Sequence, residues 1–434
     1  MKNKINIKIF CLVLSVSVSF SVCGQTYTLI QCRAMALENN IKMRTAKKNV
    51  EESEQGRKEA FTKYFPEVSA VGVGFTADKG LLEMDLLPGM RLSMMKNGFL
   101  GGVTAMQPVF TGGQIVNANK LAKIGVEVNN LRQRLMQNEV CLTTEQYFWQ
   151  IVTLKEKLNT LSSIEKMLEH MEKDVSIAMD AGIARRNDLL QMQLRLNDIK
   201  SRRISLENAL ALCKMVLAQY IGVAEDQFDV MCPVSIDAGL PGMPEERQSH
   251  EEALPNTVEY DLLDKNVQAG VVQKRLAIGK NLPSVAVGAG YMYDNLMDKD
   301  HPFGMVFASV SIPISGWWGG THAIKKQSLR LKIVEAERED SREQLLIRMQ
   351  KTWNDWNDAY KQVVVAYKSI EQSTENLRLN EDFYKAGTTK MSDLLDAQSM
   401  FQESRDKYID AYAQYQVKKL EYQIVTGHDP TIDM

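Results

Sequence analysis

The stretch AGIARRNDLL begins at Ala181, and the related stretch AGTTKMSDLL begins at Ala386, 205 residues later. The same offset links two further pairs, Pro108 with Pro313 and Gly222 with Gly427. Three matches in a single register, spread from residue 108 to residue 222, indicate an internal repeat rather than chance. We therefore expect a chain built from two copies of one structural unit.

A further match lies upstream, where the offset is larger. KNVEESEQGRKEAFTKYFP, from Lys48, matches KNVQAGVVQKRLAIGKNLP, from Lys265, with an offset of 217 residues. The difference of 12 residues places an insertion in the first copy, between Pro66 and Pro108. Each copy is then predicted to contain, in this order, a helix, a strand, a loop, a second strand, a very long helix, a turn and a last helix. The expected divisions are repeat 1 at 25–222, a proline-rich linker at 223–255, repeat 2 at 256–427 and a tail at 428–434.

The first 24 residues have the pattern of a secretory signal peptide. Lys2, Lys4 and Lys8 precede an apolar run, and small residues follow at Cys23 and Gly24. An alternative is lipid attachment at Cys23 after cleavage before it. No later stretch was expected to reach the roughly 18 uncharged apolar residues of a spanning helix. The mature chain is therefore expected to be exported and to lack a transmembrane helix.

Composition excludes several classes of protein. The chain has 434 residues, 24% charged and 44% hydrophobic, which is typical neither of disorder nor of a helical membrane bundle. A formal net charge of −2 gives no reason to expect nucleic acid as a partner. The five histidines are scattered, and no nucleophile with a base or phosphate loop is recognisable. We expect no enzyme, no cofactor and no metal, and free buried thiols at Cys141 and Cys213.

Period-two alternation predicts a β-hairpin in each copy. Val71, Val73 and Phe75 alternate with glycines, and a similar alternation surrounds Tyr291 and Tyr293. The expected hairpins cover about 66–110 and 283–314, with return strands at 103–110 and 305–314. Their loops are expected at 76–102 and 294–302. Strands of this length suit a tilted bilayer crossing, although soluble hairpins remain an alternative.

Residues 113–180 and 319–385 contain no proline, and each predicts a helix of roughly 100 Å. The first helix carries a coiled-coil seam: Leu154, Leu158, Leu161, Leu168, Met171 and Val175. The returning helices carry matching seams, which begin at Leu189 and Leu394 and end at Tyr220 and Val425. The seams contain three polar exceptions: Arg203, Ser404 and Lys418. Gly222 and Gly427 follow where helix C-caps are expected.

Four strands cannot close a membrane barrel, because the smallest single-chain barrels have eight. Open sheet edges are not tolerated in lipid. If the strands enter a membrane, several chains must therefore share one barrel. The charged helices must then project into water.

The whole mature chain resembles the TolC-type outer-membrane efflux proteins. The resemblance rests on the paired hairpins flanked by prolines, Gly319-Gly320 after the second hairpin, and the turns at 181–187 and 386–392. It implies a mainly α fold with a β-barrel part. Three protomers would share a 12-stranded barrel in outer-membrane lipid and a helical tunnel in the periplasm. It also implies an exit duct for efflux or secretion, with a periplasmic adaptor and an inner-membrane pump as partners.

The resemblance implies roles for individual residues. The tips Ala181-Gly182-Ile183 and Ala386-Gly387-Thr388 would meet the adaptor. Asp393 and Asp396 would form acidic rings at the tunnel mouth. Asp188 and Tyr384 would hold the closed mouth together. Thr389 stands where an arginine partner is expected, so Arg185, Arg186 and Lys390 are the candidates to replace that partner.

Other interpretations of the same residues remain open. Asn187-Asp188 and Ser392-Asp393 would serve equally well as helix N-caps and first-turn acids. Trp317 and Trp318 suit an interfacial belt or a packed junction. A periplasmic coiled-coil scaffold or adaptor would explain the helices but not the hairpins. A porin-like passive channel would need many more strands.

Overall fold

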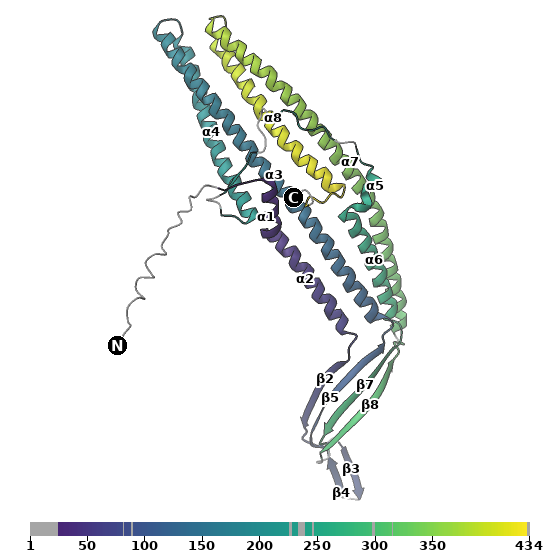
Figure 1. The fold of residues 1–434 in the computed structure, drawn as a ribbon. Coiled ribbons are helices and arrows are strands. Elements are labelled where there is room, and N and C mark those ends of the chain that lie inside the picture. The colour runs from purple at the N-terminus through teal and green to yellow at the C-terminus, as the bar shows by residue number, and fades with distance from the viewer. Residues whose placement is uncertain are drawn as a thin grey trace, which may run out of the picture.

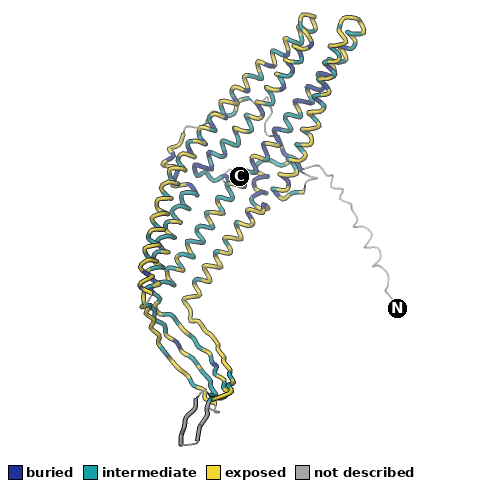
Figure 2. Tube along the Cα trace, turned by 180° about the vertical axis from the view of Figure 1, so that it is seen from behind, coloured by how far each residue is buried: buried dark blue, intermediate teal, exposed yellow. Residues whose placement is uncertain are grey.

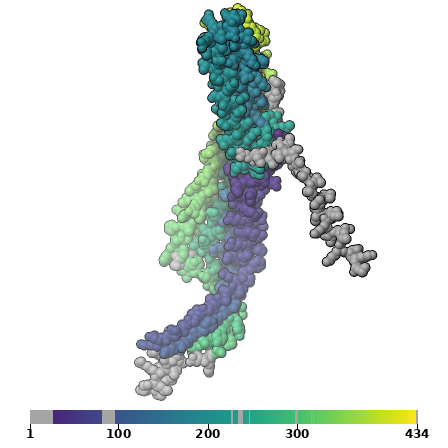
Figure 3. Space-filling model, turned by 90° about the vertical axis from the view of Figure 1, so that its left-hand side faces the viewer, coloured from purple at the N-terminus to yellow at the C-terminus, as the bar shows by residue number. Residues whose placement is uncertain are grey.

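The computed structural model describes residues 25–80, 82–87, 90–224, 228–232, 239–244, 247–296, 300–314 and 316–431. The predicted signal peptide, Cys23, and the side chains of residues 81–94 and of Trp317 lie outside the described parts. The molecule is long and mainly helical, with a small sheet at one end and two helical hairpins at the other (Figure 1). A space-filling view from the side shows one narrow body from sheet to tips (Figure 3).

Apart from the inserted hairpin β3–β4 in the first copy, the two copies have the same order of elements. The first copy comprises β1 (Gln25–Tyr27), α1 (Leu29–Asn39), α2 (Ile41–Thr62), β2 (Glu67–Thr76), β3 (Leu82–Leu87), β4 (Met90–Met94), β5 (Asn97–Phe110), α3 (Gln114–Asp180) and α4 (Arg186–Ile221). The second comprises β6 (Phe228–Val230), α5 (His250–Ala253), η3 (Leu254–Asn256), α6 (Val258–Gly279), β7 (Ser284–Asp294), β8 (His301–Ser311), α7 (Gly316–Lys385) and α8 (Met391–Val425). Asn40 and Thr257, 217 residues apart, cap α2 and α6 with their side chains. The predicted repeat is therefore present.

The two hairpins form one antiparallel sheet in the order β2-β5-β7-β8. The prediction of a loop over 76–102 is wrong for its last part, because Asn97 to Gly102 pair with β2. The inserted segment also forms a hairpin of its own, β3 with β4. Sequence alternation missed this part of β5 because Gly98, Gly101 and Gly102 provide no side chains to alternate.

Large side chains lie over the strand glycines. A Cβ at Gly288 would come within 2.4 Å of the Phe307 ring, and one at Gly102 within 2.4 Å of the Met292 sulfur. Each glycine therefore leaves space for a neighbouring strand's bulky side chain, which stabilises an otherwise weak position.

The helices continue the sheet as a single layer. Next to the sheet they lie in the order α2-α3-α6-α7, and nearer the tips in the order α4-α3-α8-α7. Among the described strands, β2 and β8 each pair on one side only. The sheet and the helical layer therefore have two open edges. Figure 2 shows that the sheet end is largely exposed or half-buried, as expected of one layer.

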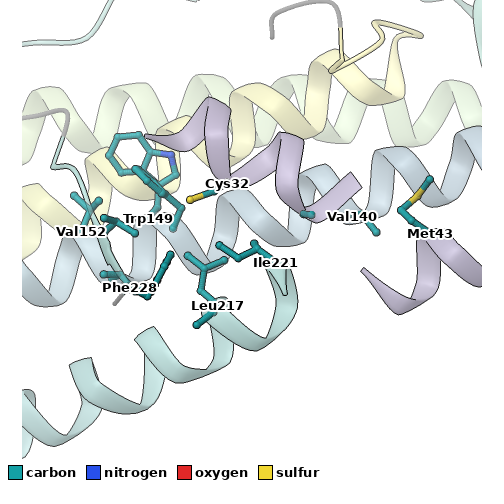
Figure 4. Packing of buried hydrophobic residues seen from close by; sticks show 13 residues of the cluster. Cys32, Met43, Val140, Trp149, Val152, Leu217, Ile221 and Phe228 are labelled. Atoms are coloured by element: carbon teal, nitrogen blue, oxygen red, sulfur yellow. The ribbon is translucent and has the colours of Figure 1, made fainter. Parts of the chain in front are cut away.

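Burial confirms the seams at their central positions. Leu161, Leu168 and Val175 of α3 are buried in one cluster with Met192 of α4 and Leu394 of α8. A second cluster, shown in Figure 4, joins α1, α3, α4 and β6 around Cys32, Phe148 and Leu217. Both long hairpins thus pack through the predicted face.

The polar exceptions in the seams find partners. Arg203 Nη1 lies 2.7 Å from Glu165 Oε2, and Glu165 is only 7% exposed. Lys418 Nζ lies 2.7 Å from Glu421 Oε2. The Ser404 hydroxyl donates to the Met400 carbonyl at 2.8 Å. These pairings explain why polar residues are tolerated in the seams.

Within its described residues, the predicted linker at 223–255 contains β6 and α5, which open the second copy, so it is more than a proline-rich connection. β6 pairs in parallel with β1, so residues about 200 positions apart form a two-stranded sheet. Farther along, the Tyr408 and Tyr415 hydroxyls donate to the carbonyls of Gly239 and Gly242 at 2.6 and 2.7 Å. Both contacts hold the linker against the helices.

The expectations about apolar stretches and about the buried thiols have different outcomes. By length and composition α4 could cross a membrane, since one 18-residue window has a mean hydropathy of 1.2, although only 17% of it is buried. The reason is that its charges gather in its first half, leaving only Glu207 and Lys214 after Arg203. Because this part of α4 carries two charges, it is not an uncharged stretch, and the expectation that no later stretch reaches about 18 uncharged apolar residues stands. Cys141 is a buried free thiol as predicted, whereas Cys213 is half-buried.

Candidate functional site

The candidate site lies at the tips, where each long helix reverses direction. Gly182 and Gly387 adopt φ of 77° and 69°, in the left-handed region that glycine enters without strain. After Gly182, the Ile183 amide donates to the Ala178 carbonyl at 2.8 Å. In the second copy the Thr388 amide donates to the Phe383 carbonyl at 3.0 Å. The two predicted turns are therefore built alike, and the Ile183 side chain is 82% exposed.

The two acids assigned to the tunnel mouth lie on the first two turns of α8, and both are exposed. Asp393 accepts hydrogen bonds from the Thr389 hydroxyl at 3.0 Å and the Ser392 hydroxyl at 3.2 Å. These bonds, the Thr389 one first, lower the pKa of Asp393 below its usual range. Asp393 therefore stays charged at neutral pH, and Thr389 takes part in binding it.

Two gate candidates from different hairpins come together. Asp188 on α4 is half-buried, and its Oδ2 accepts from the Arg185 amide at 3.3 Å. Tyr384, near the end of α7, packs against the cluster that contains Met192. Burial raises the pKa of Tyr384, and the negative charge of Asp188 raises it further. The phenol is therefore neutral and lies within the field of that carboxylate.

The predicted capping roles need correction. The N-caps are Arg185 and Lys390, two residues before Asn187 and Ser392. The expectation of first-turn acids is confirmed, because Asp188 and Asp393 both occupy the third helical position, where a carboxylate complements the positive end of the helix. Arg185, Arg186 and Lys390 are exposed, and their side chains form no ion pair within the described residues. Lys390 nevertheless acts on Asp393 through its positive charge, which helps to lower the pKa of that carboxyl.

Sequence reasoning missed a polar cluster two helical turns from the mouth. Arg195 of α4 donates to Gln398 Oε1 at 2.7 Å and to Gln402 Oε1 at 3.3 Å, both on α8. It also lies 2.9 Å from Asp198 on its own helix. Gln398 and Gln402 are 1% and 6% exposed. The signal available in the sequence was a pair of amides, Gln398 and Gln402, spaced one helical turn apart beside the seam residues Leu394 and Phe401.

The cluster continues along α8 to Asp406. Burial raises the pKa of Asp406 to about 6, although Lys157 and a hydrogen bond from Gln402 act in the opposite direction. Next to it, Lys157 Nζ of α3 lies 2.7 Å from Asp410 Oδ1. The helical hairpins are therefore joined by polar contacts as well as by the apolar cluster.

Comparison with known proteins gives a consistent result. The family profile described as "Outer membrane efflux protein" matches residues 33–223 and 264–426. A search of curated proteins found no match to this sequence.

Solved structures of outer-membrane channels share the fold at low sequence identity. The outer membrane protein VceC from Vibrio cholerae has a TM-score of 0.76 and 11% identity, with 92% of this chain and 96% of that chain covered. CusC has a TM-score of 0.78 and 14% identity, with 92% of each chain covered. The open state of the Neisseria gonorrhoeae MtrE channel has a TM-score of 0.74 and 17% identity, with 92% and 89% covered. With the profile matching most of its length, the chain belongs to the outer membrane efflux protein family.

Proposed function

We propose that three copies of this outer-membrane efflux protein close into one tube, which serves as the exit duct of a tripartite pump. The observation that carries the proposal is the pair of open edges. β2 and β8 each lack a neighbour on one side among the described strands. Unpaired strand edges are excluded from lipid, so each β2 must pair with a β8 of another copy. This contact is of the head-to-tail kind that closes into rings.

The number of copies follows from the space required. Two copies would give eight strands, a barrel whose interior is just wide enough for side chains. Three copies give twelve strands and leave a lumen for transport. Exposed valines lie along both sheet edges, with Val68 at 65% and Val306 at 87%. The helices would then extend the barrel as a tunnel into the periplasm.

The assembly can be tested by light scattering on the protein purified in detergent. We expect a stable trimer. Replacement of Ser69 in β2 and of Ser309 in β8 by proline, one at a time, should disrupt it if those edges pair between copies. Proline removes a hydrogen-bond donor and is tolerated mainly at free edges. A folded, monodisperse monomer of the wild-type protein would exclude a shared barrel.

We further propose that Asp393 and Asp396 make the tunnel mouth cation-selective. Three copies would place six carboxylates around one axis, and such a ring attracts cations. The variant Asp393→Ala with Asp396→Ala should lose cation preference and block by multivalent cations in single-channel recordings. Both side chains are exposed, so the trimer should persist. Unchanged selectivity would mean that Asp393 and Asp396 lie on an ordinary solvent-exposed helix face and do not select ions.

The orientation in the outer membrane has its own test. The longer loops of membrane barrels face outward, and residues 77–96 form the longer of the two hairpin connections in the sheet. A cysteine at Lys79 should therefore react with an impermeant thiol reagent on intact cells. Reaction only after the outer membrane is broken would mean that the hairpin loops face the periplasm. The exposed tips, including Ile183, would then be the wrong end to meet a periplasmic adaptor.

A further inference from the structure

The internal repeat provides a template for the contact between two copies of this chain. Residues of α6 lie 217 positions after their counterparts in α2, and residues of α7 lie 205 positions after those in α3. Within one copy, α3 packs against α6 and β5 pairs with β7. The equivalent neighbours of α7 and β8 are therefore α2 and β2 of a second copy. Figure 1 shows α2 and α7 at opposite edges of the layer next to the sheet.

The strand pairing between the repeats gives the register expected between copies. Thr104 of β5 lies opposite Gly290 of β7. Their counterparts are Ser309 of β8 and Val73 of β2, so Ser309 of one copy is expected opposite Val73 of the next. A shift by one residue would turn every side chain of β8 to the other face of the sheet, which fixes the register. The register in turn sets the height at which α7 meets α2.

Within one copy, a groove between α3 and α6 has walls of like charge. The residues of this groove that matter here are Lys120, Lys123 and Glu127 of α3 and Lys265, Gln268 and Val271 of α6. Lys265 Nζ lies 2.7 Å from Glu127 Oε2 across the groove. The two other lysines leave the α3 wall with a net positive charge, and the α6 wall is positive through Lys265. One ion pair therefore joins two walls that otherwise repel each other.

The equivalent groove between copies has walls of opposite charge. On α7, the counterparts of Lys120 and Glu127 are Lys325 and Lys332. On α2, the counterparts of Lys265, Gln268 and Val271 are listed in the same order: Lys48, Glu51 and Glu54. The α7 wall thus carries two positive charges, and the α2 wall a net negative charge.

These side chains are available for a partner. Lys325, Lys332 and Glu54 are exposed and form no ion pair within the part of the chain that the structure describes. Glu51 is exposed too, and its carboxylate lies 2.6 Å from the ammonium of Lys48 on its own helix. A carboxylate has acceptor sites for a second cation, so this bond does not prevent Glu51 from binding another lysine.

We propose that Lys325 and Lys332 of one copy bind Glu51 and Glu54 of the next, and that this ionic contact selects which edges associate. The proposal rests on the proposed function, since it presupposes copies joined edge to edge. Contact of α7 with α7 would bring like charges together, so the same residues disfavour a two-fold dimer that leaves both β2 edges unpaired. Exposed ion pairs contribute little to stability but accelerate and orient association. The effect is therefore expected in the rate of assembly.

Charge reversal at each edge tests the ionic contact. Lys325→Glu with Lys332→Glu makes the α7 edge acidic, and Glu51→Lys with Glu54→Lys makes the α2 edge basic. Each double variant of the full-length mature protein should form trimers about tenfold more slowly or worse on refolding from urea into detergent at low salt, followed by light scattering. The four changes combined restore opposite charges and should restore the wild-type rate. At about 1 M salt, where the Debye length is about 3 Å, these rates should converge.

A matched control lies on a helix without an open side. Lys166→Glu with Lys173→Glu makes the same change in charge with the same spacing of seven residues, and both lysines are exposed. They belong to α3, which lies between α4 and α8 of its own copy. This variant should assemble at the wild-type rate, and an equally slow control would trace the effect to net charge and overturn the ionic contact. Edge variants that assemble like the wild type, or a slow fourfold variant, would overturn it as well.

A cross-link tests which residues meet, and it needs milder changes. In a background that lacks the two half-buried cysteines, Glu51→Cys with Lys332→Cys and a short bifunctional thiol reagent should give covalent dimers and trimers on denaturing gels. Glu127→Cys with Lys265→Cys, at the template contact, should react only within one chain. Trimers that give no product between chains from the first pair would overturn the ionic contact alone. A monomeric wild type would overturn both this contact and the proposed duct.

Discussion

The two copies have the same elements but stabilise them by different chemistry. In the first copy, Arg33 of α1 forms a buried ion pair with Glu145 of α3, which also accepts from Trp149 Nε1 at 3.1 Å. The matching residues in the second copy are His250, which lies 6.1 Å from the Tyr422 ring, and Gln350. Burial and the nearby Arg247 lower the pKa of His250, which favours its neutral form.

The same exchange occurs nearer the tips. The first copy places Arg203 against Glu165 inside the hairpin. The equivalent residues in the second copy are Tyr408, which is completely buried, and Ile370 beside it in an aromatic cluster. At these positions the charged residues of the first copy are replaced in the second by His250, Gln350, Tyr408 and Ile370, which form no ion pair with one another.

This difference shows that the repeat keeps its elements while the side chains at equivalent positions change in both chemistry and burial; of the pairs compared, only Arg33 and His250 are both buried. A buried ion pair holds one geometry but contributes little net stability, whereas an aromatic cluster contributes apolar area. The first copy is therefore expected to be the more sensitive to loss of one charged partner. The second is expected to be the more sensitive to pH, because His250 and Asp406 are there.

The largest effect should come from breaking the buried pair of the first copy. Glu145→Ala leaves the Arg33 charge buried without a partner, which should lower the free energy of unfolding by about 3–5 kcal/mol. Thermal unfolding followed by far-UV circular dichroism, at fixed protein concentration, measures it. The matched change Gln350→Ala should stay within about 0.5 kcal/mol. Arg33→Met combined with Glu145→Leu should recover most of the loss, and equal effects at 145 and 350 would refute the contrast.

The second effect separates the copies by pH. Asp406 has a pKa of about 6, above its unfolded value, so its contribution is fully present below that unfolded value and is lost as pH rises through 6. The change in the free energy of unfolding caused by Asp406→Asn should therefore be more favourable at pH 7.5 than at pH 5, by about 1–2 kcal/mol after allowance for partial solvent screening. Denaturant unfolding at both pH values measures this. Its counterpart Ser201 has no charge, so Ser201→Ala should not change the pH dependence.

A smaller effect is expected where the second copy binds the linker. Tyr408→Phe removes the hydroxyl that donates to the Gly239 carbonyl at 2.6 Å and should cost about 0.5–1.5 kcal/mol. The ring remains, so the aromatic cluster should persist. Limited proteolysis near residue 239 should become faster in the variant. Unchanged stability and cleavage would mean that the linker is held by other contacts.

The smallest effect concerns His250. Its native pKa is lowered, so its contribution is present above the unfolded value and lost as pH falls through the native one. His250→Asn should therefore flatten the acid side of the stability curve between pH 6.5 and pH 5. Arg33→Lys, at the equivalent position of the first copy, keeps a charge throughout this range and should leave the shape of that curve unchanged. A flattened curve in both variants would argue against His250 as its origin.

The sequence alone determined the internal repeat and the lengths and turns of the long helices. Proline-free stretches gave the lengths of α3 and α7, and the glycines at 182 and 387 gave their turns, because backbone constraints of this kind act locally. The seams were predictable because apolar residues repeat with the helical period. The family resemblance came from the same features, which is why it held over most of the chain.

Only the tertiary structure decided which of these elements meet. A seam has the same period whatever it packs against, so nothing in the chain could assign Arg195 to Gln398 across two hairpins. The pairing of β1 with β6 depends equally on where α1 and α4 place two short segments. The glycine-rich start of β5 lacked the side chains that reveal a strand, and its partner β2 supplied the register. Local patterns fix periodicity, whereas the choice of partner depends on the packing of the whole layer.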